Sequence, residues 1–219
     1  MRKFILIFKT IFVLLVFLTT FSFAANDTGI NQENVKEKLV GHKAMFTDDG
    51  FFNVYYDYRN ILNHHFPSGW MGDYGDIGMD EKWEDNPQSG ETCMKWTYSA
   101  QGKQGAGYAG SYWQRPHGDW GSYKDGFDLR QAKRLTFWAR GEHGNEKIKF
   151  QIGGLGGKYP DSDKKISEVL TLSRDWQQFS LNLEGLELSY IDGIFFWLVE
   201  KEMSPNGCVF YLDNIRYEK

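Results

Sequence analysis

The chain has 219 residues, a formal net charge of −4 and 25% charged residues. Its length suits a single all-β domain, since sandwiches and barrels often reach this size undivided. The mild charge and the lack of any basic run exclude the surface that a phosphate backbone needs, so we expect no nucleic-acid partner. The 12 tyrosines and 8 tryptophans are many for this length, and such side chains call for polar partners or a surface use.

Residues 1–24 have the features of a secretory signal peptide. Two basic residues precede an apolar stretch, and Ser22-Phe23-Ala24 places small residues at the two positions that signal peptidase recognises before its cleavage site. The alternative is an uncleaved membrane anchor, but the uninterrupted apolar run is shorter than the roughly 20 residues of a spanning helix. We therefore expect a mature chain from Ala25 that is secreted or periplasmic, with no membrane contact after cleavage. Residues 25–50 read as an N-terminal lead-in, and residues 51–219 as the domain.

The domain is predicted to consist of strands, because short alternating segments are divided by Gly, Asp and Pro turns. The predicted strands are 51–58, 91–99, 106–114, 134–140, 147–152, 165–172, 176–181, 193–200 and 207–217. The stretch Asp128–Ala132 is compatible with a short helix. Many strands of similar length indicate an all-β fold, an antiparallel β-sandwich of the jelly-roll kind.

Alternation also predicts which side chains face the core. The predicted core sets are Ile148, Phe150 and Ile152; Leu135, Phe137 and Ala139; and Phe210 and Leu212. The opposite face of these strands mixes aromatic, amide and charged groups. Segment 193–200 is apolar on both faces, which predicts a central strand and leaves the direction of Trp197 open.

No catalytic signature is present: the sequence has no G-x-S-x-G, H-E-x-x-H, P-loop or dinucleotide fingerprint. Glycoside hydrolysis needs two carboxylates roughly 5 to 9.5 Å apart across a cleft. Glu200 and Glu202 have a suitable two-residue spacing, but they lie at a strand end beside Lys201. We therefore expect a protein that is not an enzyme.

Two glycine-rich aromatic segments, 67–84 and 105–127, are candidate binding loops. Glycines bend the backbone tightly and lift rings clear of it, and sugars pack on aromatic rings while polar side chains bond their hydroxyls. The candidate ligand-binding residues from these loops are Trp70, Asp73, Tyr74, Trp113, Gln114 and Trp120. A rival location is the polar sheet face, with Trp138, Arg140, Gln151 and Tyr211. The alternative to both is that the rings only pin long loops onto the sandwich.

Cys93 and Cys208 are the only cysteines. An even pair in an oxidising compartment predicts a disulfide between them. Two buried, unpaired thiols are the alternative.

Five segments carry a family resemblance: PSGWMGDYGDI, SGETCMKWTYSA, QGAGYAGSYWQ, KRLTFWARGE and NGCVFYLDNIRYE. They resemble secreted bacterial galactose-binding-like jelly rolls, the architecture of many carbohydrate-binding modules. The resemblance spans about Phe51 to Glu218 and implies a jelly-roll fold and a carbohydrate ligand. The expected function is non-catalytic binding of a polysaccharide. A structural or adhesion protein of the cell envelope is the alternative, and a small glycan-active enzyme is a third option.

The same resemblance implies a structural calcium ion (Ca²⁺). We expect Asp213, on the last strand, and Asp57, after the first, to contribute its ligands, because these strands often pair in jelly rolls. The acidic turn residues Asp73, Asp76 and Asp80 form a rival cluster. The alternative for Asp213 is that it accepts backbone hydrogen bonds from a neighbouring loop.

Overall fold

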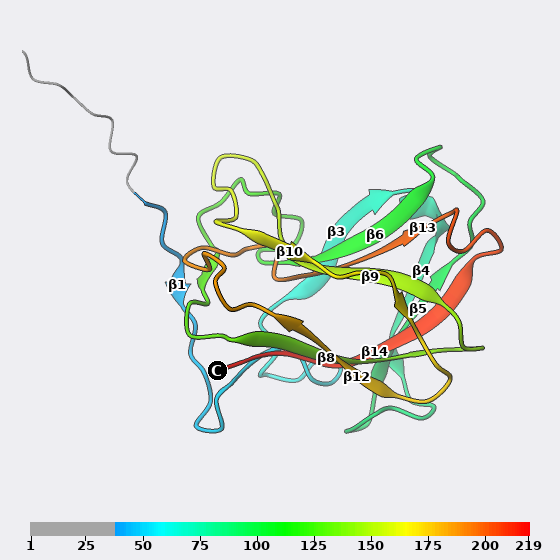
Figure 1. The fold of residues 1–219 in the computed structure, drawn as a ribbon, viewed down its shortest axis with the longest axis horizontal. Coiled ribbons are helices and arrows are strands. Elements are labelled where there is room, and N and C mark those ends of the chain that lie inside the picture. Colours follow the sequence, from blue (N-terminus) through cyan, green and yellow to red (C-terminus); the bar gives the residue numbers. More distant parts are fainter. Residues whose placement is uncertain (1–37) are drawn as a thin grey trace, which may run out of the picture. The chain divides into compact units, whose positions relative to one another are not determined.

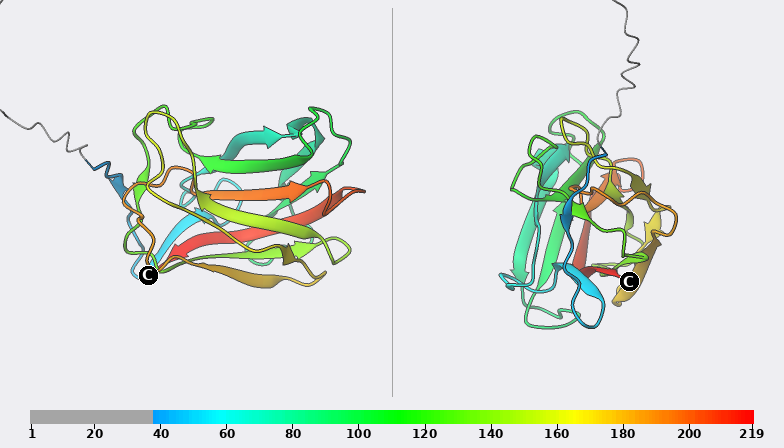
Figure 2. Two further views of the ribbon diagram at one scale, coloured as in Figure 1. Left: turned by 45° about the horizontal axis from the view of Figure 1, so that its top comes forward. Right: turned by 90° about the vertical axis from the view of Figure 1, so that its left-hand side faces the viewer.

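Two six-stranded antiparallel sheets face each other across the core of the computed structural model (Figure 1). The structure describes residues 38–219, so the predicted signal peptide and the first half of the predicted lead-in lie outside the described residues. Figure 2 shows the two sheets as separate layers of strands. This arrangement confirms the predicted all-β antiparallel sandwich.

The first sheet, called sheet I, has the strand order β10-β9-β13-β6-β3, with β11 also paired to β9. Its strands are β3 (Phe66–Gly72), β6 (Tyr108–Gln114), β9 (Lys147–Gly153), β10 (Lys164–Ile166), β11 (Leu170–Thr171) and β13 (Phe195–Glu200). The second, sheet II, has the order β12-β8-β14-β5-β4, with β2 paired to β14. Its strands are β2 (Phe51–Tyr55), β4 (Ile77–Trp83), β5 (Cys93–Tyr98), β8 (Arg134–Gly141), β12 (Gln177–Asn182) and β14 (Cys208–Glu218).

The last residues of the predicted lead-in belong to the domain. Strand β1 (His42–Lys43) pairs in parallel with β7 (Phe127–Asp128). Ala44 is buried in the core, and the backbone N–H of Gly41 donates to Ser189 O. The packed unit therefore includes residues before 51. No helix among the described residues is long and apolar enough to span a membrane.

The alternation of side chains is confirmed on the strands where it was predicted. Ile148, Phe150 and Ile152 on β9 all lie in the core, as do the predicted core residues of β8 and β14. Strand β13 lies between β9 and β6, which confirms its central position. Its Trp197 points inward and is fully buried.

Three sequence predictions of local structure are wrong. The segment 67–84 is not a loop: it forms β3, a 3₁₀ turn η1 (Tyr74–Asp76) and β4. The stretch after Asp128 is a turn closed by Ala132 N–H donating to Leu129 O, not a helix. The predicted strand 165–172 is split into β10 and β11, which pair with different parts of β9.

Much of the aromatic content fills the core. Trp96, Trp113 and Trp197 are fully buried, with the centroid of the Trp96 ring 5.5 Å from Trp113 and 4.9 Å from Trp197. Within the described residues none of their indole N–H groups has a hydrogen-bond partner. Burying a ring of 150–250 Å² contributes about 4–6 kcal/mol at ~25 cal/mol per Å², and an unpaired N–H costs about 1–3 kcal/mol. Packing therefore outweighs the missing bond, contrary to the expectation that tryptophans need polar partners.

The predicted disulfide between Cys93 and Cys208 is wrong. Cys208 pairs with Tyr98 at one end of β5, whereas Cys93 is at the other end of that strand. Five residues at ~3.4 Å each separate the two positions by roughly 17 Å, far beyond the ~4.4–6.8 Å between the Cα atoms of a disulfide. Both residues are free thiols, and burial raises the pKa of each to about 12.

Thiol labelling tests this directly. We expect the unreduced protein to label with two thiols per chain when denatured, and slowly when native because burial suppresses the reactive thiolate. The measurement is mass spectrometry after alkylation in guanidinium. If the denatured, unreduced protein took up no label, the two cysteines would have to be bridged.

Candidate functional site

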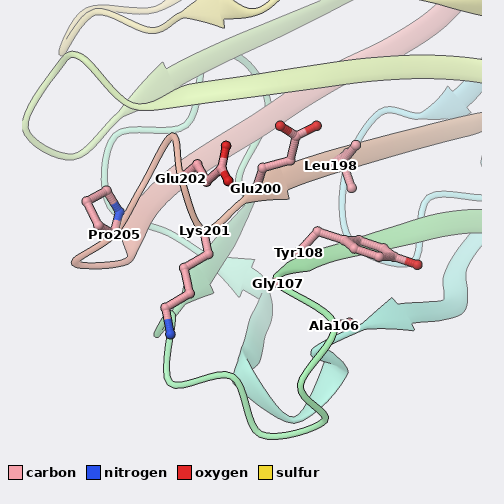
Figure 3. A pocket seen from close by; sticks show the side chains of 8 residues that line it. All are labelled: Ala106, Gly107, Tyr108, Leu198, Glu200, Lys201, Glu202 and Pro205. Atoms are coloured by element: carbon pink, nitrogen blue, oxygen red, sulfur yellow. The ribbon is translucent and has the colours of Figure 1, made fainter.

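A cavity of about 720 Å³ lies on the outer face of sheet I. Because Ala109 and Val199 point into the core, their neighbours Tyr108, Leu198 and Glu200 project outward from β6 and β13. The turn after β13 closes one side of the cavity with Lys201, Glu202 and Pro205. Figure 3 shows Tyr108 on one strand, Leu198 and Glu200 on the next, and the turn residues beside them. The volume lies within the range of about 300–1,000 Å³ typical of ligand pockets.

Beside Tyr108 and Glu200, the floor continues as a row of four residues in register across the sheet. The row consists of Met71, Gly110, Leu198 and Lys149, one each from β3, β6, β13 and β9. A Cβ atom added to Gly110 would lie 2.6 Å from Trp197 O and 2.7 Å from the Phe196 ring. Only glycine fits there, and its lack of a side chain keeps the floor low.

A second row in register is aromatic and amide in character. It consists of Gly69, Tyr112, Phe196 and Gln151. Tyr112 stacks on Phe196 with ring centroids 4.1 Å apart, and Gln151 Nε2 donates to Tyr112 Oη at 2.6 Å. Burial raises the pKa of Tyr112, so its hydroxyl stays protonated at physiological pH. The loop residue Trp120 meets the Tyr112 ring edge-on at 6.1 Å and is 40% exposed.

We call this surface the groove: the outer face of sheet I from Tyr108 and Glu200, across the Leu198 and Phe196 rows, to Trp120. Charge is present but balanced, because Lys149 Nζ pairs with Glu200 Oε1 at 2.8 Å. The groove thus offers the Tyr108 ring and an aliphatic floor beside carboxylate, amide and ammonium groups, whereas the Tyr112 and Phe196 rings are buried below its surface. This mixture matches a sugar, which presents apolar C–H faces and a rim of hydroxyls.

Several residues predicted to bind ligand lie inside the domain. Trp113 is fully buried, and Gln114 is buried with its Oε1 accepting from the Ser68 hydroxyl at 3.3 Å. Asp73 is also buried, and its carboxylate accepts the backbone N–H groups of Gln104, Ala106 and Gly107 at 2.8–2.9 Å. These hydrogen bonds hold the pKa of Asp73 below its usual value and fasten the loop before β6. The prediction of Trp113, Gln114 and Asp73 as ligand contacts is therefore wrong.

The other loop candidates remain at the surface. Trp70 is 37% exposed on the edge strand β3, where its ring lies 6.0 Å from that of Trp96. Tyr74 is exposed in η1. Of the loop residues selected from the sequence, Trp120 is the one whose ring contacts the aromatic row of the groove.

The rival polar face is divided between the two sheets. Gln151 lies on sheet I, whereas Trp138, Arg140 and Tyr211 lie on the outer face of sheet II. There the Arg140 guanidinium is 3.7 Å from the centroid of Tyr211 and 5.4 Å from that of Trp176. Arg140 is buried in this stack, so these side chains close this part of the face on themselves.

The aspartates expected to hold calcium are occupied by backbone donors. Asp213 accepts the N–H groups of Gln88, Ser89 and Asn214, and Asp57 accepts those of Glu91 and Thr92. Asp213 thus accepts backbone hydrogen bonds from a neighbouring loop, which is the alternative to calcium binding that was expected for it. Asp73 and Asp76, in the rival cluster, likewise accept backbone N–H groups. Among residues 38–219 no three Asp, Glu, His or Cys side chains are arranged to share an ion. The residues fit calcium poorly, and its binding stays a prediction.

Sequence reasoning missed the central groove residues Leu198, Phe196 and Met71. The sequence does predict which residues of β6 face the groove. In YAGSYWQ, alternation puts Tyr108, Gly110 and Tyr112 on the face opposite the core residues Ala109 and Trp113. Which neighbours complete the rows depends on strand order, which alternation does not reveal.

No protein-family model matches the chain, and neither does any curated protein. Solved structures do match. The family 30 carbohydrate-binding module of cellulosomal cellulase Cel9D-Cel44B of Clostridium thermocellum has a TM-score of 0.53 at 12% identity, covering 77% of this chain and 97% of that one. The chain has the jelly-roll fold of these modules. The family 11 module of Lic26A-Cel5E from the same organism agrees, with a TM-score of 0.51 at 16% identity over 78% of this chain and 96% of the other. At such identities the likeness establishes the fold.

Proposed function

We propose that this chain is a secreted, non-catalytic carbohydrate-binding protein that holds a polysaccharide in the groove on sheet I. The observation that carries the proposal is the groove itself, with the 720 Å³ cavity against Tyr108 and Leu198 and the Tyr112–Phe196 stack beside it. The jelly-roll fold shared with carbohydrate-binding modules supports it. Secretion is inferred from the N-terminal sequence alone.

The ligand contacts follow from the geometry of the groove. Tyr108 and Leu198 give a sugar ring an apolar surface, and hydroxyl groups can bond to the carboxylates of Glu200 and Glu202 at the rim. Buried aromatic anchors carry most of the energy in typical binding sites, while rim contacts mainly exclude water. Tyr108 is therefore the residue whose removal should cost most affinity.

Replacing Tyr108 by alanine should weaken binding to the best ligand about tenfold or more, which corresponds to about 1.4 kcal/mol. The measurement is affinity electrophoresis against soluble β-glucans, xylans, mannans and pectins, followed by calorimetry. Trp138→Ala is the matched control, because it removes an aromatic side chain from the outer face of sheet II and should leave affinity unchanged.

The reverse pattern, with Trp138→Ala weakened and Tyr108→Ala unaffected, would move the site to sheet II. A wild-type protein that binds none of the polysaccharides would contradict the proposed function. Because Glu200 and Glu202 line one cavity, each polysaccharide should also be assayed for new reducing ends. Their release by wild type but not by Glu202→Gln would show an enzyme.

A further inference from the structure

Asp192, in the turn before β13, is a buried acid without a hydrogen-bond partner. Its side chain is fully buried, and neither carboxylate oxygen has a hydrogen-bond partner within the described residues. A carboxylate left in this state is costly, because burial removes its hydration and nothing replaces it. Asp161 provides a contrast, since its oxygens accept the backbone N–H groups of Leu155, Asp192 and Gly193.

The charges around Asp192 add to this cost. Asp119, which is buried, Asp161 and Asp125 all act on it as like charges and raise its pKa, after burial, which is the largest cause. The Arg115 backbone N–H lies near the carboxylate and lowers its pKa, but its contact does not meet hydrogen-bond geometry. The titratable and charged groups on the elements packed around it are Asp119, Asp125, Arg115 and Tyr123 of loop 115–126, Asp161 and Asp163 of loop 154–163, Tyr190 beside it, Tyr112 of β6, Tyr217 of β14 and His42 of β1. The Arg115 guanidinium and the His42 imidazole both pair with Asp125.

The turn that contains Asp192 ties together the two loops at the Trp120 end of the groove. Loop 154–163 is held by Asp161, which accepts the Asp192 N–H at 2.6 Å, and by the Ser162 N–H, which donates to Tyr190 O at 2.8 Å. Loop 115–126 is held by the Tyr190 hydroxyl, which donates to Tyr123 O at 3.2 Å.

The two loops also contact each other directly. The Tyr159 N–H donates to Gly121 O at 2.9 Å, and a Cβ atom on Gly121 would lie 2.0 Å from Gly156 O. The two loops are therefore joined to each other as well as to the turn that contains Asp192. A change of charge at Asp192 must therefore act on loops 115–126 and 154–163 together.

We propose that Asp192 is a positioning residue that is held as a neutral carboxylic acid, and that its ionisation in mildly alkaline solution loosens both loops. The burial of Asp192 and its like-charged neighbours raise its pKa to about 8. In the packed loops the acid carries its proton below that pH, and opening becomes steadily more favourable as the pH rises toward it. Above it, the ionised form is stabilised by opening toward water. Trp120 then loses its place against Tyr112, and glycan affinity falls. Only this last consequence rests on the proposed function.

Amide hydrogen exchange tests the loops without any ligand. Opening would let Asp192 ionise near pH 3.8, whereas in the packed loops it ionises near pH 8, so opening becomes about tenfold more favourable for each pH unit between these values. The ratio of wild-type to Asp192→Asn protection in segments 115–126 and 154–163 should therefore be about a hundredfold lower at pH 7 than at pH 5. Comparing the proteins at equal pH cancels the intrinsic rate. Asp161→Asn is the matched control: it disturbs the same cluster by losing acceptors, and should reduce protection at both pH values.

A second measurement does not depend on the folding of any variant. The Asp192 carboxyl carbon, followed by NMR in ¹³C-labelled wild type, should titrate near pH 8. Titration below pH 5, or a ratio of wild-type to Asp192→Asn loop protection that is the same at pH 5 and pH 7, would overturn the proposal. So would a rise in melting temperature with millimolar calcium over chelator that Asp192→Asn abolishes, since the cluster would then hold a cation in place of a proton.

Discussion

Trp113→Ala is expected to lower the free energy of unfolding by about 3–5 kcal/mol, the usual loss for a large aromatic removed from a core. Trp113 is fully buried between the sheets, with its ring centroid 4.9 Å from that of Phe195 and 5.5 Å from that of Trp96. These two neighbours belong to β13 and β5, which lie in opposite sheets, so the void cannot close fully. The loss should appear as a lower denaturation midpoint in urea, with little change in glycan affinity at temperatures where the variant is folded.

Trp120→Ala is the control for this experiment. The Trp120 side chain is 40% exposed, so its removal should cost less than about 1 kcal/mol of stability. Its effect should appear in binding, because the ring contacts Tyr112 at the end of the groove. If Trp113→Ala proved stable but unable to bind, Trp113 would return to the ligand site.

The stability of the domain should fall as the pH rises from about 4 to 8. Burial, the largest cause in each case, raises the pKa of Asp161 to about 6, of Asp213 to about 7 and of Asp192 to about 8. In the unfolded chain these groups ionise near pH 3.8. Between the two values the folded state binds more protons than the unfolded state, so the free energy of unfolding decreases with pH. Each group changes it by up to about 1.4 kcal/mol per pH unit, giving a total of several kcal/mol.

Other carboxylates act in the opposite sense at lower pH. Hydrogen bonds to Arg130 hold the pKa of Asp128 below its usual value, and a bond from the Tyr211 hydroxyl does so for Glu142. Their stabilisation is present above pH 4 and is lost as the pH falls through their folded values. Stability should therefore be greatest in weakly acidic solution. Urea unfolding between pH 4 and 9 measures this, and Asp192→Asn should flatten the alkaline side. A wild-type stability that rises from pH 5 to 8 would contradict the prediction.

Alternation in the sequence determined the fold class and much of the core. On β8, β9 and β14 the inward residues follow directly from the two-residue period, because neighbouring side chains on a strand must point to opposite faces. The apolar content of both faces placed β13 in the centre of a sheet. Glycine-rich strands are harder to predict. The glycines of β3 and β4 resemble turn residues, so the sequence predicts a loop where the structure has two strands.

Tertiary structure alone decided the candidate site. The groove combines Met71, Gly110, Leu198 and Lys149 from four strands that are separated from one another by long stretches of chain. Their meeting depends on strand order and register, and local periodicity contains neither. The same applies to Cys93 and Cys208, which lie on the neighbouring strands β5 and β14, because Cys208 pairs with the end of β5 opposite to Cys93. It applies to Trp113 as well, since a ring on a strand can pack inside or bind a ligand, and only the sheet placed opposite determines which.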